Sequence, residues 1–356
     1  MQDKFSYSEL LNNLVFTLVK ESGSDIHLVV GMSPAVRING EIVTISKIEP
    51  LKHSETVSIL REMINDKNYE SFLENQQIDF AYSHKEEYRF RGHAFFQMGT
   101  VAIVLRLIPK VKSISELNLP DIIYEVIKRN QGFFLVVGPV GQGKSTTLAA
   151  MINHINQNEK KMITTIEDPI EYIHDSAKSY IMQREIGKDA SGAKMALEAA
   201  FRQDVDVILI GEMRDIETIS TAVTAAETGH LVFATLHTNS AAQTVDRIID
   251  SFTANQQDQV RTQLASSLIG VFSQRLLPKI GGGMIPIYEL MLVNNAVQNL
   301  IREKRTYEID NIIETGSVHG MISFDRCLAD AVMRGDIALD EAMRVAKNPK
   351  MFDQLI

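Results

Sequence analysis

Residues 138–145 read Gly-Pro-Val-Gly-Gln-Gly-Lys-Ser and match the spacing G-x-x-x-x-G-K-[ST] in full. The glycines allow the backbone to bend so that successive N–H groups face one anion, and a helix beginning near Lys144 adds its positive end. Lys144 supplies a mobile cation for the β- and γ-phosphates of a nucleotide, and Ser145 supplies a hydroxyl for Mg²⁺. The segment predicts a nucleotide site formed by Gly138, Pro139, Val140, Gly141, Gln142, Gly143, Lys144, Ser145 and Thr146.

A carboxylate follows a second apolar segment. Residues 205–212 read Val-Asp-Val-Ile-Leu-Ile-Gly-Glu, so a short buried strand delivers Glu212 at its carboxyl end. Ligands of an open parallel sheet bind at that end of the strands. Many P-loop proteins have an aspartate where this chain has Gly211, so we expect Glu212 to serve the Mg²⁺ ion or its water shell.

Three more carboxylates lie in residues 164–171, which read Thr-Thr-Ile-Glu-Asp-Pro-Ile-Glu. A nucleotide hydrolase needs a base or a water-orienting residue opposite the leaving phosphate, and one of these acids can fill that role. The alternative is a solvated acidic turn around Pro169. His230 and His237 flank the apolar run 231–236. A lone histidine beside a strand is usually structural, whereas two at opposite ends of one strand favour a functional role without deciding it.

Alternating strands and helices must position these residues. Short apolar runs at 133–137, 162–166, 205–210 and 231–236 predict buried strands, with helical sequence between them, as at 146–155. This alternation predicts an α/β domain with a mainly parallel sheet covered on both faces. The tail after Gly283 predicts mostly helix, most clearly at 296–303 and 324–334.

The first 110 residues have a different pattern. Helices are predicted near 10–19 and 56–64, strands at 26–30, 78–82, 88–96 and 101–108, and a hairpin at 35–45 around Asn39 and Gly40. This half is α+β by pattern. We therefore expect a domain at 1–110, a polar linker at 111–117, and a second domain at 118–356 whose helical region begins at about 284.

Composition excludes several classes of protein. A length of 356 residues fits two domains, and a net charge of -9 speaks against sequence-independent binding of nucleic acid. The single cysteine, Cys327, excludes a disulfide framework and a four-thiolate zinc site. No apolar run approaches the roughly 18 residues of a membrane span. Composition by itself does not identify an activity.

The order of these motifs resembles the secretion ATPase superfamily (GspE/PilT/VirB11-like), and within it the type IV pilus retraction ATPases of the PilT group. The resemblance extends to Ser-Asp-Ile-His-Leu at 24–28 and Arg-Ile-Asn-Gly at 37–40. Residues 296–303, Ala-Val-Gln-Asn-Leu-Ile-Arg-Glu, are similar to the AIRNLIRE segment of that group.

The resemblance implies a homohexameric ring in which ATP and Mg²⁺ bind between a PAS-like N-terminal domain and a RecA-like domain with a mostly helical tail. It implies that Lys144 and Ser145 hold the phosphates and Mg²⁺, that Glu212 is the Walker B glutamate and that Glu171 is the general base. It further implies a histidine pair that senses the nucleotide state, His230 and His237, and phosphate-binding arginines from the first domain, Arg89, Arg91 and Arg106.

The same resemblance implies a cytoplasmic protein, peripheral to the inner membrane, that attaches through an integral platform protein and works with a paralogous retraction ATPase. The sequence departs from the group's pattern at five positions, one of which is Val205, where a proline is usual in the Walker B region. Val140 and Gln142 replace two hydroxyl residues of the usual Gly-Pro-Thr-Gly-Ser-Gly-Lys-Ser, and Gly99 lies where many relatives have an arginine. Gln298 replaces the arginine of AIRNLIRE, a segment tied to retraction rather than to hydrolysis.

We therefore expect an ATP-driven motor for pilus retraction and twitching motility. The alternatives within the superfamily are an accessory retraction ATPase, a pilus-assembly ATPase and a secretion ATPase. The chain length and the lone cysteine count against the last two. A small-molecule P-loop kinase would need an acceptor pocket and a lid, and the acidic charge counts against a nucleic-acid translocase. A regulatory subunit without hydrolysis would not need Lys144, Glu171 and Glu212 together.

Overall fold

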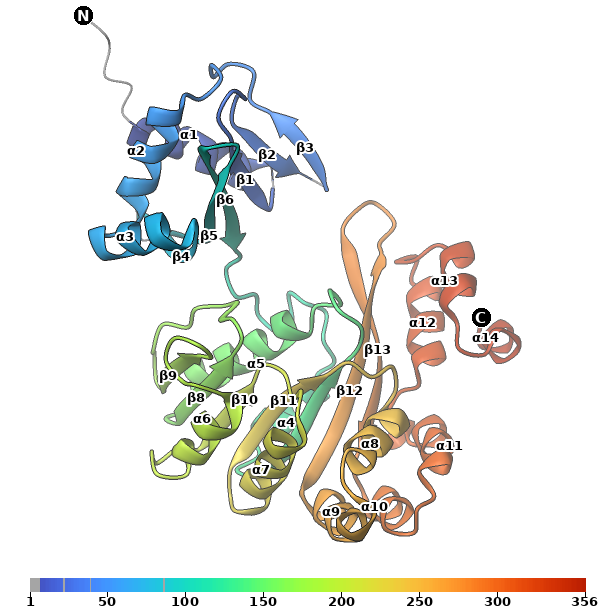
Figure 1. Cartoon of the computed structure of the whole chain (residues 1–356). Coiled ribbons are helices and arrows are strands. Elements are labelled where there is room, and N and C mark those ends of the chain that lie inside the picture. The colour runs from blue at the N-terminus through green and yellow to red at the C-terminus, as the bar shows by residue number, and fades with distance from the viewer. Residues whose placement is uncertain (1–6, 22, 39, 86) are drawn as a thin grey trace, which may run out of the picture. The chain divides into compact units, whose positions relative to one another are not determined.

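The chain folds into two compact units, Met1–Lys110 and Val111–Ile356. The computed structural model describes residues 7–21, 23–38, 40–85 and 87–356 (Figure 1). Each unit has its own hydrophobic core, so each is described separately. Among the described residues, no helix combines the length and apolarity that crossing a membrane requires.

The first unit is a six-stranded antiparallel sheet with strand order β3-β2-β1-β6-β5-β4. Its strands are β1 (Asp25–Leu28), β2 (Ala35–Ile38), β3 (Glu41–Thr44), β4 (Gln77–His84), β5 (Tyr88–Gln97) and β6 (Thr100–Ile108). Its helices are α1 (Tyr7–Lys20), α2 (His53–Met63) and α3 (Asp66–Asn75). The α+β pattern is confirmed, although Asn39 of the expected hairpin lies outside the described residues.

Helix α3 is an element that the sequence pattern did not predict. Asn65 caps it, because its side chain accepts a hydrogen bond from the backbone N–H of Asn68. Phe72 is the fully buried residue of this helix and stacks on Phe96 of β5. One apolar anchor in ten residues is too weak a periodic signal to indicate a helix by itself.

The second unit is built on a seven-stranded sheet with strand order β13-β12-β7-β11-β10-β8-β9. Its strands are β7 (Gly132–Val137), β8 (Met162–Glu167), β9 (Tyr180–Glu185), β10 (Val207–Ile210), β11 (Leu231–Leu236), β12 (Leu268–Pro278) and β13 (Met284–Leu292). All neighbours pair in parallel except β12 and β13, which form an antiparallel edge pair. The mainly parallel sheet is therefore confirmed, but β9, β12 and β13 were not predicted.

Helices cover both faces of this sheet, as Figure 1 shows. Phe133, Leu135 and Val137 of β7 belong to one apolar cluster, and Phe134 and Val136 belong to the other. The first cluster includes α6 (Ala193–Ala200), α7 (Ile216–Glu227), α8 (Ala241–Asp250), α9 (Ala254–Ser267), α10 (Asn295–Arg302) and α11 (Ile309–Thr315). The second includes α4 (Ile122–Ile127) and α5 (Lys144–Asn158). A strand buried on both faces explains the uninterrupted apolar runs of the sequence.

The C-terminal region is mostly helical, but its helices begin at Asn295 rather than at about residue 284, because β13 occupies Met284–Leu292. The sequence of β13 is apolar on both sides of Glu289, and such short apolar runs do not distinguish a buried strand from a helix. The remaining elements are the short 3₁₀ helices η1 (Thr306–Glu308) and η2 (Ser317–His319) and the helices α12 (Phe324–Met333), α13 (Leu339–Val345) and α14 (Pro349–Leu355).

Candidate nucleotide site

The phosphate loop connects the carboxyl end of β7 to the N-terminus of α5. Two of its glycines are required by geometry. Gly138 has a φ of 145°, and a Cβ atom there would lie 2.3 Å from the carbonyl oxygen of Gln274. Gly143, with a φ of 78°, adopts the left-handed conformation immediately before the helix. Val140 at the loop tip is 80% exposed.

Lys144 folds back over this loop. Its Nζ atom donates to the carbonyl oxygens of Gly138 at 2.8 Å and Pro139 at 2.9 Å. Burial lowers the pKa of Lys144, and the carboxylates of Glu212 and Glu171 oppose that shift. The lysine is therefore held among acceptors near two of the predicted acids.

His237 joins this lysine to the acid at the end of β10. Its Nδ1 atom lies 3.2 Å from Nζ of Lys144, and its Nε2 atom lies 2.9 Å from Oε1 of Glu212. An ammonium group has no lone pair, so Nδ1 must accept and Nε2 must carry the proton that is donated to Glu212. The strand order β7-β11-β10 creates this contact, because it places three carboxyl ends side by side.

Arg214 is a residue of this site that sequence reasoning missed. Its Nε atom donates to Oε2 of Glu212 at 2.8 Å, and its Nη1 atom lies 3.1 Å from Oδ2 of Asp168. Asp215 begins α7 directly afterwards as its cap, accepting from the backbone N–H of Thr218. Arg214 therefore lies directly before the capped start of α7. The sequence did offer a signal for it, because Arg214 lies two residues after Glu212, the acid at the end of the predicted strand.

Tyr172 ties the segment with three carboxylates to α5. Its hydroxyl lies 2.7 Å from Oγ1 of Thr146, and its carbonyl oxygen accepts from Nε2 of Gln183 at 2.8 Å. Burial raises the pKa of Tyr172, whereas the adjacent Glu171 remains exposed. The tyrosine thus holds Glu171 beside the first turn of the helix that follows the phosphate loop.

The three acids of this segment have different environments. Glu167 is half-buried and accepts from Oγ1 of Thr165 at 2.6 Å, and burial raises its pKa. Asp168 pairs with Arg214, and Glu171 is exposed. A Cβ atom on Gly211 would lie 3.4 Å from Cα of Glu167, so β8 and β10 bring the two positions into contact. A uniformly solvated turn does not describe this arrangement.

His230 lies at the opposite end of β11 from His237. Its Nδ1 atom lies 3.0 Å from the carbonyl oxygen of Ala225, and its ring lies 5.5 Å from that of Phe201. Within the second unit the two histidines are therefore separated by the whole strand. Only His237 contacts Lys144 and Glu212.

Arg89, Arg91 and Arg106 are exposed on strands of the first unit. Cross-strand register aligns Arg91 of β5 with Arg106 of β6, and Arg106 with Asp25 of β1. Asp25 is 3% exposed and accepts from Nε of Arg106 at 2.8 Å. Burial raises the pKa of Asp25, but hydrogen bonds from Ser24 and Arg106 outweigh burial and leave that pKa below its ordinary value. One face of the sheet thus carries a row of three guanidinium groups, of which that of Arg106 is held by the buried carboxylate of Asp25.

The donor set fits a magnesium ion that is bound together with phosphates. Among residues 7–21, 23–38, 40–85 and 87–356, no group of three His, Cys, Asp or Glu side chains is arranged so that it could hold a metal ion. Mg²⁺ usually takes one or two protein oxygens plus substrate phosphates, rather than a cage made by the protein. One hydroxyl, Ser145, and one carboxylate, Glu212, agree with that pattern.

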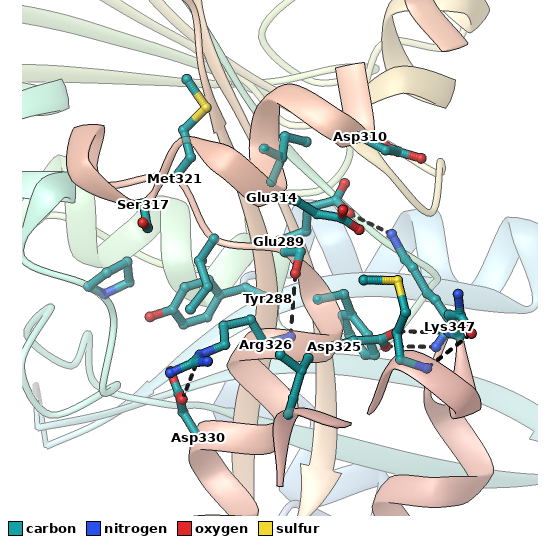
Figure 2. Close-up of a pocket in the computed structure, with 18 of the residues that line it drawn as sticks. Tyr288, Glu289, Asp310, Glu314, Ser317, Met321, Asp325, Arg326, Asp330 and Lys347 are labelled. Atoms are coloured by element: carbon teal, nitrogen blue, oxygen red, sulfur yellow. Dashed lines mark hydrogen bonds and ion pairs between the residues drawn. The ribbon is translucent and has the colours of Figure 1, made fainter. Parts of the chain in front are cut away.

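The second unit also contains a cavity of about 860 Å³ between β13, α11, α12 and α14 (Figure 2). Its buried carboxylate, Glu289, accepts from Nζ of Lys347 at 2.6 Å and from the backbone N–H of Ala241 at 2.8 Å. Arg326 pairs with Asp330 at 3.1 Å. Both cations are already paired with carboxylates, so neither is free to pair with a phosphate.

A phosphate loop between a buried parallel strand and a helix, with acids at the ends of the neighbouring strands, defines a P-loop nucleotide-binding protein. A family model described as type II/IV secretion system protein matches residues 1–284, and the chain belongs to that family.

Among its relatives, the chain is 43% identical to the "Type IV pilus retractation ATPase PilT" of Pseudomonas aeruginosa, over 96% of this chain and 99% of that protein. It is 44% identical to a "Twitching motility protein" of Neisseria gonorrhoeae, over 89% of this chain and 85% of that protein. A crystal structure of the pilus retraction motor PilT with bound ADP superposes with a TM-score of 0.88 at 42% identity, covering 96% of this chain and 98% of that one.

Proposed function

We propose that this chain is an ATP-hydrolysing motor that powers type IV pilus retraction and twitching motility. The observation that carries the proposal is the contact series from Lys144 through His237 to Glu212, which joins the phosphate loop to an acid on a neighbouring strand. The similarity to a retraction ATPase over nearly the full length of both chains supports the mechanical role.

ATP binding begins at the loop. Backbone N–H groups and the N-terminus of α5 bind the phosphates, and Lys144 leaves the carbonyl oxygens of Gly138 and Pro139 to contact the β- and γ-phosphates. Ser145 and Glu212 hold Mg²⁺, which when bound neutralises charge that develops on the phosphates. Glu171 accepts the proton of the attacking water. His237 loses its contact with Lys144 as the lysine turns, so its position depends on whether a nucleotide is present.

The arginine row of the first unit completes the proposed mechanism. Arg89, Arg91 and Arg106 supply cations to the phosphates from a second rigid body, so hydrolysis depends on closure of one body on the other. We assign the chain to a homohexamer at the cytoplasmic face of the inner membrane, where an integral platform protein attaches it to the pilus. His230 belongs to the same sensing pair as His237 in this proposal, acting from the other end of β11.

Phosphate release by the purified chain with Mg²⁺ and ATP tests the enzymatic part. The expected result is turnover in the parent and a loss of at least ~100-fold in Lys144→Ala, because the lysine contacts the transferred phosphate. Lys350→Ala on the exposed face of α14 is the matched control. Equal rates for the parent and Lys144→Ala would remove this site as the source of hydrolysis.

Pilus length and twitching in a deletion strain test the mechanical part. Excess pili without movement are expected for a retraction motor, whereas bald cells would indicate assembly. An accessory retraction ATPase is the second candidate, and Gln298 is the observation that favours it. This residue lies half-buried on α10 and lines a cavity with Arg129 and Glu227. If the chain is accessory, its deletion should leave part of the twitching, because another motor still retracts the pilus, and Gln298→Arg should increase the retraction that this chain drives by itself.

A further inference from the structure

Strand β12 extends beyond the strand that it pairs with on one side. Its parallel pairing with β7 ends at Ser273 and Val137, but β12 continues to Pro278. Directly after Val137 the chain enters the phosphate loop. On the side of β7, the last part of β12 therefore runs beside this loop, whereas on its other side it stays paired with β13.

Two hydrogen bonds connect the loop to that part of β12, and both involve Gln142. The backbone N–H of Leu276 donates to Oε1 of Gln142 at 2.7 Å. The side chain of Gln274 donates from Nε2 to the carbonyl oxygen of Gln142 at 2.5 Å. The pairing between β12 and β7 ends before Leu276, so no residue of β7 accepts from its N–H. The side chain of Gln142 supplies the acceptor instead.

Gln274 extends the connection to α5. It is 2% exposed, and its Oε1 atom accepts from Oγ1 of Thr147 at 2.8 Å. A Cβ atom on Gly143 would lie 3.2 Å from its Nε2 atom, so the loop packs closely against this side chain. Gln274 of β12 therefore holds both the phosphate loop and Thr147, which lies in the first turn of α5.

The reach of the side chain at position 142 decides whether the bond from the backbone N–H of Leu276 exists. Oε1 of a glutamine lies two carbon atoms beyond the position of a serine hydroxyl, and serine is the residue of the usual loop pattern. A hydroxyl placed on Cβ could not span the distance to Leu276 without moving the loop backbone toward β12. The replacement of serine by Gln142 therefore adds a connection that depends on this residue.

We propose that Gln142 is a positioning residue that fastens the phosphate loop to β12 and keeps the loop in the conformation that binds phosphates. It acts through the loop backbone, because its side-chain oxygen is already used by Leu276. The inference rests on the proposed nucleotide site and deepens it: part of the cost of ordering the loop is met before the nucleotide arrives.

Gln142→Met tests the connection, because methionine keeps the length of the side chain and removes the strong acceptor. In the full-length protein without nucleotide, amide hydrogen exchange at Leu276 should become at least ~10-fold faster, since the protecting bond is lost. The dissociation constant for ADP should rise about 3-fold to 10-fold, the effect of one net hydrogen bond. The KM for ATP should rise by a similar factor, and kcat should change less.

Two further variants separate positioning from general destabilisation. Gln142→Glu retains an acceptor, so Leu276 should exchange as slowly as in the parent, while ADP affinity falls through charge repulsion and recovers at high salt. Gln257→Met removes another half-buried glutamine whose Nε2 atom donates to the carbonyl oxygen of Phe252, and it should leave both readouts unchanged.

Unchanged exchange at Leu276 in Gln142→Met would overturn the inference, because the connection would not exist in solution. Faster exchange with unaltered ADP affinity would overturn it as well, because the connection would not position the loop. A parent protein that binds ADP but releases no phosphate from ATP would instead refute the proposed hydrolysis and leave the test of Gln142 intact.

Discussion

The Nε2 atom of His237 lies 2.9 Å from a carboxylate oxygen of Glu212. The other ring nitrogen faces Lys144, so one imidazole spans the distance between the phosphate loop and the acid on the neighbouring strand. Because the lysine can only donate, the imidazole is held in one tautomer and in one orientation. Glu212, which follows β10, is consequently oriented by His237, which follows β11.

His237→Ala should lower kcat about 10-fold to 100-fold, because an acid that loses its orienting partner is no longer held in position. The dissociation constant for ADP should change less, since the backbone of the loop supplies most phosphate contacts. Steady-state phosphate release and binding of a fluorescent ADP analogue measure the two effects. His319→Ala, an exposed histidine of η2, is the control, and equal kcat in the two variants would contradict the role of His237.

Glu171→Gln should retain ATP affinity and lose turnover by about 100-fold or more, because a neutral amide cannot accept the proton of water. Single-turnover hydrolysis with pre-bound ATP isolates this step from binding. Glu212→Gln should instead raise the Mg²⁺ concentration needed for activity. If Glu171→Gln lost affinity and turnover equally, Glu171 would be a binding residue rather than the base.

Arg214→Ala should lower the Mg²⁺ concentration for half-maximal nucleotide binding about 2-fold to 5-fold. The guanidinium group occupies Oε2 of Glu212, and an exposed ion pair of this kind is worth roughly 0.2–1 kcal/mol. Titration of ADP binding with Mg²⁺ measures the change. Arg302→Ala on α10 serves as the control, and an unchanged Mg²⁺ dependence would indicate that Arg214 does not compete for this carboxylate.

Arg91→Gln and Arg106→Gln should each reduce kcat by about 100-fold or more while the chain still binds ADP, because arginines supplied to a transferring phosphate act mainly in the transition state. Arg61→Gln is the matched control, since this arginine of α2 lies over the ring of Tyr69. Loss of ADP binding in the two test variants would indicate a structural role for the arginine row.

The stability of the second unit should fall with acid through His174. Burial lowers the pKa of this histidine to about 4, below its ordinary value of 6.5, so the unfolded chain takes up the proton first. Its contribution is complete above pH 6.5 and decreases as the pH falls toward 4. We expect a loss of about 2 kcal/mol in the free energy of unfolding at pH 5. Denaturant titrations of the parent and of His174→Asn at pH 7.5 and 5 measure it; equal losses in the two proteins would contradict the assignment.

In the nucleotide-binding unit, the sequence pattern correctly predicted the strands that are buried on both faces of the sheet. Residues 231–236 form β11 with those bounds, and 133–137 and 162–166 fall within β7 and β8. The sequence pattern failed at β12 and β13, because an antiparallel edge pair buried by helices has no alternation of apolar and polar residues. It failed at β9 for the opposite reason, since that edge strand is only partly buried.

Residues close together in the chain determined the phosphate loop, because glycine conformations, the lysine and the start of a helix act on one anion locally. Only the tertiary structure decided which acids, histidines and cations belong to the site. Sheet order brought His237 between Lys144 and Glu212 and left His230 at the far end of its strand. Gln142 and Leu276, 134 positions apart, meet because β12 runs past the end of β7. Contacts of this kind depend on which strands become neighbours, and that choice is made by burial of the whole sheet rather than by any local segment.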